Sequence, residues 1–369
     1  MTEWIECTLD KLGEIVGGAT PSTKCEDYYG GSIPWITPKD LSSFKGRYIT
    51  SGERNITEKG LASCSAQMMP KDAVLFTSRA PIGYVAIASQ SVCTNQGFKS
   101  IVVNEKADPL FVYYLLKYNK DAIEAMGSGT TFKEVSGKTM RAVKVRIPLD
   151  VSYQKRIAAV LDSLDTKIEN NERINDNLQQ QAQAIYSSMF IDNPDPAWSH
   201  GHLSDLITVK YGKDHKKLAD GIYPVYGSGG IMRYVERPLY NKESVLIPRK
   251  GTLNNVMYVN QPFWSVDTMF YTEMKLPNVA KFVYHFVKAK DLASMNAGSA
   301  VPSMTTDILN AMEVVIPSAS ALEEFESLVA PMYEAMEAND VQSKALSQMR
   351  DTLLPKLMSG AIDVSDVQL

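Results

Sequence analysis

The longest periodic pattern in the chain runs from Ser152 to Asp192, a stretch that contains no glycine or proline. Apolar and small polar residues recur there at alternating spacings of four and three, as in the seam of a coiled coil. This spacing predicts one continuous helix over residues 151–192, ended by Asn193 and Pro194. The seam consists of Ile157, Leu161, Leu164, Ile168, Asn171, Asn175, Leu178, Ala182, Ile185 and Met189.

A second seam of the same kind predicts a second long helix within residues 320–369. Ser320 and Glu323 have the spacing of a capping box, which predicts the start of the helix, and Gly360 predicts its end. Pro331 and Pro355 are expected to kink this helix near its start and to loosen its end. Its seam consists of Phe325, Val329, Met332, Met336, Asn339, Ser343, Leu346, Leu353 and Leu357.

The polar positions of the two seams would meet if the helices paired in opposite directions. Asn171 and Asn175 would then face Asn339 and Ser343, and these polar layers would fix the register of the pair. The alternative is that the two segments are unrelated core helices with a few solvated positions.

The segment before each long helix combines sequence patterns typical of strands with patterns typical of helices. Each holds short apolar runs typical of strands, such as VLFTSR from Val74 and VLIPRK from Val245, and one helical pattern, from Phe111 or from Phe282. We therefore expect a mixed α+β fold with two globular α/β lobes separated by two long antiparallel coiled-coil helices. The expected boundaries are residues 1–150 for the first lobe, 151–192 for the first helix, 193–319 for the second lobe, and 320–369 for the second helix and C-terminal tail.

The same features recur in the same order along the chain, which indicates an internal repeat with pseudo-two-fold symmetry. The offset between the copies falls from 194 near the start to 169 near the end of the lobes, so the second copy is shorter by internal deletions. The matched pairs include Trp4 with Trp198, Val74 with Val245, Arg79 with Arg249, and Pro148 with Pro317.

Composition narrows the class of protein. Hydrophobic residues make up 44% of the 369 residues and charged residues 22%, as in ordinary globular chains. No segment is apolar enough for a membrane span or a signal peptide, so we expect a cytoplasmic protein with no membrane partner. The net charge is −4, but residues 320–369 hold 3 basic and 9 acidic side chains, whereas residues 1–150 hold 18 and 16. The lobes are thus slightly basic, which permits a nucleic-acid partner.

No catalytic or metal-binding motif has the spacing that its chemistry requires. The four cysteines form no CxxC pair and lie far along the chain from the four histidines, so no metal site is expected. Ser136–Thr139 lacks the preceding glycine of a phosphate-binding loop, and Gly227–Gly230 lacks the spaced third glycine of a dinucleotide fingerprint. Asp195 is too far along the chain from Glu273 and Lys275 to indicate a nuclease centre. We predict no catalytic residue.

The polar chemistry that remains favours recognition of DNA. Arginine and lysine beside a glycine can bind phosphates, and amides and hydroxyls can read base edges. Such residues occur on turns of both copies, although each one alone is most simply read as a solvated surface residue. The predicted DNA contacts are Lys39, Arg79, Thr94, Asn95, Gln96, Lys133, Lys213, Lys216, Lys217, Tyr226, Ser228, Arg249, Lys250, Asn254 and Asn255.

Two segments resemble a known family. QKRIAAVLDSLDTKIE at Gln154–Glu169 and LLPKLMSGAIDV at Leu353–Val364, together with the two lobes that each end in VxIP, resemble the DNA-specificity subunit of type I restriction-modification enzymes. The resemblance covers nearly the whole length. The chain departs from the family pattern where LEEFESLVAPM, from Leu322, stands in for QKRIAAVLDSL.

The resemblance implies a subunit without catalysis of its own. Each lobe would read one half of a split, asymmetric site in double-stranded DNA, and the helices would set the spacer. The helices would also bind two methyltransferase subunits, and restriction (translocase) subunits would join the complex. No cofactor is expected on this chain, because S-adenosylmethionine, ATP and magnesium would belong to the partner subunits. The helix residues assigned to this coiled coil and partner surface are Ile157, Leu161, Leu164, Ile168, Leu178, Ile185, Leu346 and Leu353.

Two other classes of function remain open at this point. The chain could be a non-enzymatic adaptor whose lobes bind proteins and are held apart by the coiled coil, or an enzyme with an unrecognised site. The separation of acidic charge from the lobes favours a DNA reader over an adaptor.

Overall fold

The structure is a computed structural model that describes residues 3–79, 81–129, 133–295 and 303–367. By its internal contacts, the chain divides into two compact units, Met1–Glu172 with Asp340–Leu369, and Arg173–Asn339. Each unit contains one lobe and parts of both long helices. The expected boundaries at residues 150, 192 and 319 separate the lobes from the long helices. The division into two compact units does not test these boundaries, which stay a prediction.

The first unit contains three sheets. Their strand orders are β2-β9-β6-β7-β4, β5-β3-β8 and β1-β10. The strands are β1 (Trp4–Thr8), β2 (Gly13–Gly17), β3 (Tyr29–Ile36), β4 (Tyr48–Ile49), β5 (Asn55–Ile56), β6 (Val74–Phe76), β7 (Val85–Ala88), β8 (Cys93–Thr94), β9 (Lys99–Val103) and β10 (Lys144–Pro148). The helices of the lobe are α1 (Pro38–Ser42), α2 (Glu58–Ala62), α3 (Pro109–Tyr118), α4 (Lys120–Ala125) and α5 (Gly137–Ala142).

The second unit repeats this plan with fewer elements. Its sheets have the orders β12-β18-β15-β16, β14-β13-β17 and β11-β19. The strands are β11 (Ser199–His202), β12 (Ile207–Tyr211), β13 (Asp220–Gly227), β14 (Gly230–Val235), β15 (Ser244–Pro248), β16 (Met257–Val259), β17 (Trp264–Ser265), β18 (Met269–Met274) and β19 (Glu313–Ile316). The helices of the lobe are α7 (Leu203–Leu206), α8 (Ala280–Lys288) and α9 (Thr306–Asn310).

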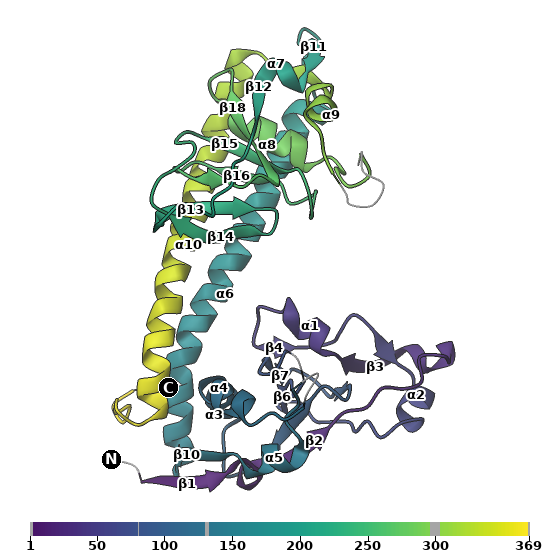
Figure 1. The fold of residues 1–369 in the computed structure, drawn as a ribbon, viewed down its shortest axis with the longest axis vertical. Helices are drawn as coiled ribbons and strands as arrows, with labels where there is room; N and C mark the ends of the chain where they lie inside the picture. The colour runs from purple at the N-terminus through teal and green to yellow at the C-terminus, as the bar shows by residue number, and fades with distance from the viewer. Residues whose placement is uncertain (1–2, 80, 130–132, 296–302, 368–369) are drawn as a thin grey trace. The chain divides into compact units, whose positions relative to one another are not determined.

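The two long helices are α6 (Val151–Ser187), which continues as a π-helical turn through Ser188–Asp192, and α10 (Ala319–Met358). They lie side by side and run in opposite directions (Figure 1). Both predicted seams are confirmed, because every seam residue is buried or half-buried. The mixed α+β fold with two lobes and an antiparallel helix pair is therefore confirmed.

The polar layers between the helices meet as predicted. In the first unit, Asn171 Nδ2 donates hydrogen bonds to Ser343 Oγ at 3.1 Å and Gln342 Oε1 at 2.9 Å. In the second unit, Asn339 Nδ2 donates to Asn175 Oδ1 at 2.8 Å. An amide placed one residue out of register would lose these partners, so the layers favour one alignment of the helices.

The predicted capping box at Ser320 is wrong. Helix α10 begins at Ala319, and its cap is Ser318, whose Oγ accepts a hydrogen bond from the Ala321 amide at 3.3 Å. The Ser318 carbonyl already accepts from the Leu322 amide at 3.1 Å, so Ser320 lies inside the first turn. The helix is not interrupted at Pro331 or Pro355, both of which are exposed. Packing of the apolar seam on either side outweighs the missing amide hydrogen bond at each proline.

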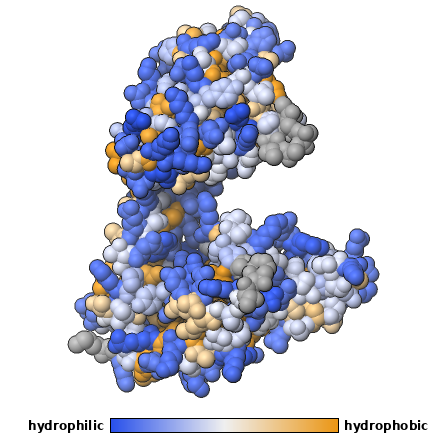
Figure 2. All heavy atoms as spheres, in the orientation of Figure 1, coloured by the Kyte–Doolittle hydropathy of each residue, from blue (hydrophilic) through white to orange (hydrophobic). Residues whose placement is uncertain are grey.

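Each unit buries its own apolar core, and each core includes both long helices. In the first unit, Ile157 and Leu161 of α6 and Leu357 of α10 pack with α3. In the second unit, Tyr186 of α6 and Phe325 of α10 pack with α8. The face drawn in Figure 2 is mainly polar, with apolar residues scattered among the polar ones. Among the described residues, no helix is both long and apolar enough to cross a membrane.

Candidate nucleic-acid interface

Three chain segments that carry predicted DNA contacts meet in the first lobe. The Ser78 amide, next to Arg79, donates to the Gly97 carbonyl at 2.7 Å. A Cβ atom at Gly97 would lie only 2.8 Å from Cγ of Pro38, which is next to Lys39. The residues brought together here, which we call the first candidate surface, are Lys39, Arg79, Asn95 and Gln96.

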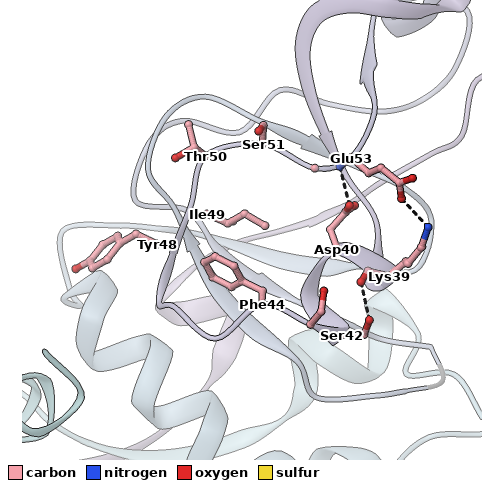
Figure 3. A pocket seen from close by; sticks show the side chains of 11 residues that line it. Lys39, Asp40, Ser42, Phe44, Tyr48, Ile49, Thr50, Ser51 and Glu53 are labelled. Carbon is pink, nitrogen blue, oxygen red and sulfur yellow. Dashed lines mark hydrogen bonds and ion pairs between the residues drawn. The ribbon is translucent and has the colours of Figure 1, made fainter. Parts of the chain in front are cut away.

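The charges of this surface are partly neutralised by carboxylates distant in sequence. Lys39 is one of the residues that line a pocket (Figure 3), and it forms an ion pair with Glu53 at 2.6 Å. The hydrogen bond between these two side chains raises the pKa of Lys39. Arg79 Nε donates to Glu134 Oε2 at 2.8 Å, and Lys99 lies 3.7 Å from the other oxygen of that carboxylate. Lys133, the residue before Glu134, is exposed. Neither Glu53 nor Glu134 is marked by a local sequence pattern as a partner of these cations.

The polar side chains predicted to read base edges in this lobe differ in how much of each is exposed to a ligand. Gln96 is exposed and accepts a hydrogen bond from the Thr20 hydroxyl. Asn95 Oδ1 accepts from the Gly97 amide at 2.9 Å, which orders the loop, and its side chain stays half-buried. Thr94 is only 1% exposed, and its carbonyl accepts from the Ala19 amide at 3.0 Å. The prediction that Thr94 reads a base edge is therefore wrong, because strand β8 places its side chain inside the lobe.

A corresponding group of residues comes together in the second lobe. The guanidinium of Arg249 lies 5.2 Å from the centre of the Tyr211 ring, and Asn255 Nδ2 donates to the Ser228 carbonyl at 2.8 Å. Gly251 has a φ of +86°, and a Cβ atom there would lie 2.7 Å from Ser228 Oγ. The tip of the β13–β14 hairpin thus packs against the loop after β15. We call Arg249, Lys250, Ser228 and Asn255 the second candidate surface.

The remaining predictions in the second lobe have different outcomes. Lys213, Lys216 and Lys217 are exposed on the loop after β12. Tyr226 is only 9% exposed and packs edge-on against Phe263, so little of its side chain is available to DNA, and its role as a contact stays a prediction.

Asn254 is exposed, but its amide is already used within the protein. Its Nδ2 donates to Asp291 Oδ1 at 3.0 Å, a bond that lowers the pKa of Asp291, and its Oδ1 accepts from the Ala293 amide at 3.0 Å. The side chain holds a loop in place, and we therefore assign it a structural role in place of a base contact.

The sheet registers correct one match between the copies. Thr77 pairs with Phe98 in the first lobe and Pro248 pairs with Met269 in the second, and both pairs are offset by 171 residues. Arg79 therefore corresponds to Lys250, and Arg249 corresponds to Ser78. The isolated bridges of Arg79 to Glu134 and of Lys250 to Ser303 agree with this register. The predicted equivalence of Arg79 and Arg249 is wrong by one residue. Matching the two arginines by residue type requires a one-residue gap after Val74 and Val245, and the strand pairing contains no such gap.

The helix residues assigned to a coiled coil and partner surface fall into two groups. Ile157 and Leu161 are fully buried in the core of the first unit and are not accessible to a partner. The half-buried ones are Leu164, Ile168, Leu178, Ile185, Leu346 and Leu353.

The two other glycine and serine motifs have local roles in the backbone. Ser136 caps α5, since its Oγ accepts from the Thr139 amide at 3.0 Å. Gly227 pairs with Gly230 across the tight turn of the β13–β14 hairpin, where Gly230 has a φ of +109°. Ser136 thus begins a helix, and Gly227 and Gly230 close a hairpin turn.

Comparison with known proteins identifies the family. The family model for the type I restriction modification DNA specificity domain matches residues 1–180 and again residues 197–324. The MjaIX type I restriction enzyme specificity subunit of Methanocaldococcus jannaschii is 32% identical, over 99% of this chain and 95% of that protein. The EcoprrI specificity subunit of Escherichia coli is 23% identical, over 90% and 89% of the two chains.

A solved structure shares the fold. The crystal structure of the type I restriction-modification S subunit from M. genitalium matches with a TM-score of 0.63 and 19% identity, over 96% of each chain. The two matches to the family model and the similarity to the M. jannaschii subunit over nearly the full length show that the chain belongs to the family of type I restriction-modification DNA specificity subunits.

Proposed function

We propose that each lobe of this specificity subunit reads one half of a split, asymmetric DNA site, and that the chain itself catalyses no reaction. Within the complex, S-adenosylmethionine, ATP and magnesium would be bound by the methyltransferase and restriction subunits. The long helices would set the spacer between the half-sites and dock two methyltransferase subunits through their half-buried seam residues.

One observation carries the proposal: the two lobes share a backbone frame but carry different side chains at equivalent positions. Arg249 stands where the first lobe has Ser78, and Lys250 stands where it has Arg79. The Lys213 amide donates to the Ser265 carbonyl as the Ala19 amide donates to the Thr94 carbonyl. A common frame with different donors and cations is what reading two different half-sites requires.

The helix pair supports the spacer role. The seam and its asparagine layers fix one alignment of α6 and α10, and an α-helix rises about 1.5 Å per residue. Adding one turn to both helices would therefore move the attachment points of the lobes apart by about 6 Å, or roughly two base pairs.

Methylation mapping of the host genome tests the proposal. Cells with this gene should methylate a split motif that disappears on deletion of the gene. A four-residue insertion between Asn175 and Leu178, matched by one in α10 between Met336 and Asn339, should lengthen the spacer and leave both half-sequences unchanged. An unchanged spacer in that variant would refute the ruler role.

The alternative function, a protein-binding adaptor, predicts a different result. Binding of duplex DNA by the chain with its methyltransferase partner should show a steep dependence on salt, because cations in the lobes release counterions from phosphates. An adaptor would bind no DNA at low salt. Because the lobes are only slightly basic, we expect weak DNA binding by the chain alone.

A further inference from the structure

Arg47 binds helix α6 through the ends of its guanidinium. Its Nη1 donates to Asp162 Oδ1 at 2.6 Å and to the Asp162 carbonyl at 2.9 Å. Its Nη2 donates to Thr166 Oγ1 and to Glu169 Oε2, each at 2.9 Å. These acceptors occupy one face of α6, at spacings of four and three residues. The arginine side chain is 7% exposed, while Asp162 and Glu169 keep about a third of their surface in contact with solvent.

The backbone of Arg47 belongs to the part of the lobe that carries the first candidate surface. Its carbonyl accepts from the Ile87 amide at 2.7 Å, which extends the pairing of β4 with β7. The residue lies between α1, which bears Lys39, and β4. Arg47 therefore joins the outer edge of the five-stranded sheet directly to α6, beside the segment proposed to meet DNA.

The second copy has a much weaker connection at the equivalent place. Glu337 of α10 matches Glu169 in the helix repeat, and it accepts one hydrogen bond, from Asn260 Nδ2 at 3.0 Å. Both of these side chains belong to exposed residues. Ala330 stands where the first copy has Asp162, and among the described residues the second sheet ends at β16, the counterpart of β7. At this one place, therefore, a buried multidentate arginine joins the sheet edge of the first lobe to α6, whereas an exposed single hydrogen bond joins the second lobe to α10.

We propose that Arg47 is a positioning residue that fixes the α1–β4 segment of the first lobe against α6 and thereby sets the sequence choice of the first half-site. This inference rests on the proposed function, since it assumes that the lobe reads DNA. Arg47 itself need not touch DNA, because its charged end is occupied by α6. A base-reading side chain must be held within a fraction of an ångström to discriminate, and the clamp supplies that constraint.

The test uses the full chain in complex with its methyltransferase partner. In Arg47→Met, the apolar stem is kept and the two carboxylates can hydrate, so the lobe should still fold. We expect amide hydrogen exchange in residues 38–56 to speed up about ten-fold, with residues 207–274 unchanged as an internal reference. The methylated motif should become degenerate in one half only.

Three further variants separate positioning from loss of folding. Arg47→Lys keeps the charge but cannot reach all four acceptors, so its exchange and degeneracy should lie between those of the wild type and Arg47→Met. Glu169→Gln keeps an oxygen that can accept from Arg47 Nη2, so both the exchange rate and the methylated motif should stay close to those of the wild type. Asn260→Ala, the matched change in the second copy, should leave the motif unchanged.

The outcomes distinguish this inference from the proposed function. Faster exchange with an unchanged motif would overturn the role of Arg47 in sequence choice and leave the proposed function intact. The inference would also be overturned if Arg47→Met made both halves of the methylated motif degenerate, or if it left amide hydrogen exchange in residues 38–56 unchanged. A wild-type complex that methylates no split motif would instead refute the proposed function, and with it the link between the clamp and specificity.

Discussion

Tyr114 and His285 occupy equivalent positions in the two copies, and each lies between its lobe and both long helices. Tyr114 Oη donates to Asp165 Oδ2 of α6 at 2.8 Å, and Arg350 of α10 binds the other oxygen at 2.7 Å. His285 binds Gln183 Oε1 of α6 through Nδ1 at 2.8 Å and the Tyr333 hydroxyl of α10 through Nε2 at 2.9 Å.

The two polar centres differ chemically although the backbone around them is repeated. The first centre contains a buried carboxylate balanced by an arginine, and the second contains only groups that are neutral near pH 7. Each centre ties one helix of a lobe to the helix pair, so its loss should affect the unit in which it lies.

Removing the Tyr114 hydroxyl should destabilise the protein. In Tyr114→Phe, the Asp165 side chain, which is 8% exposed, loses one of its two hydrogen-bond partners and keeps its ion pair with Arg350. We expect the free energy of unfolding to fall by about 1–2 kcal/mol. Urea unfolding measures it, with Tyr118→Phe, an exposed tyrosine on the same helix, as the control. Equal effects of the two substitutions would contradict the assignment.

His285 should make stability depend on pH. Burial lowers its pKa to about 4, whereas in the unfolded chain the pKa is near 6.5. The unfolded state therefore binds the proton more readily, so the contribution is fully present above pH 6.5 and is lost as the pH falls towards 4. The loss should reach about 3 kcal/mol.

Replacement of the histidine isolates this contribution. His285→Asn keeps a polar group without a titration in this range, while the carboxylates titrate alike in both proteins. The difference in unfolding free energy between wild type and variant should therefore shrink from pH 7 to pH 4.5. Parallel pH curves would show that His285 does not respond as its burial requires.

Replacing Thr94 should leave DNA recognition unchanged. Its hydroxyl is buried and has no hydrogen-bond partner in the part of the chain that the structure describes. Thr94→Val should thus be neutral or stabilising by up to about 1 kcal/mol. Ser265 is the counterpart of Thr94 in the second lobe, and its buried hydroxyl also has no hydrogen-bond partner among the described residues. Ser265→Ala should therefore also leave the stability unchanged or raise it slightly. A changed methylated motif in Thr94→Val would restore Thr94 as a DNA contact.

Arg249 should contact phosphate rather than a base edge. Gly251 and exposed Lys250 beside it suit backbone binding, and its guanidinium is held over the Tyr211 ring. Arg249→Ala should weaken binding to all sequences alike and lower the salt slope by about one. Lys39→Ala should change the dependence of DNA affinity on salt concentration less than Arg249→Ala does, because Glu53 already neutralises the charge of Lys39.

Competition binding with single-base variants of the DNA site distinguishes a phosphate contact of Arg249 from a base contact. If Arg249 contacted a guanine edge, the substitution would cost about 1–3 kcal/mol at one base position and relax discrimination only there. That result would overturn the phosphate assignment. An unchanged affinity for every sequence would make Arg249 an ordinary surface residue.

The sequence by itself was sufficient for the long helices and for their pairing. The seam repeats along more than thirty residues of α6, and such periodicity depends only on neighbours a few positions away. Asn171 and Asn175 could be placed opposite Ser343 and Asn339 because one seam fixes the phase of the whole helix. The repeat of the lobes was visible for a related reason, since colinear matches accumulate along the chain.

Only the tertiary structure decided which side chains of the lobes are available to a ligand. Thr94 turned out to be buried, and Arg79 corresponds to Lys250 rather than to Arg249, because strand pairing is non-local and a shift of one residue moves a side chain to the other face. The partners of Arg79 and Arg47 are Glu134 and α6, 55 and more than 110 residues away. No periodicity encodes such contacts, since they arise when separate segments pack together.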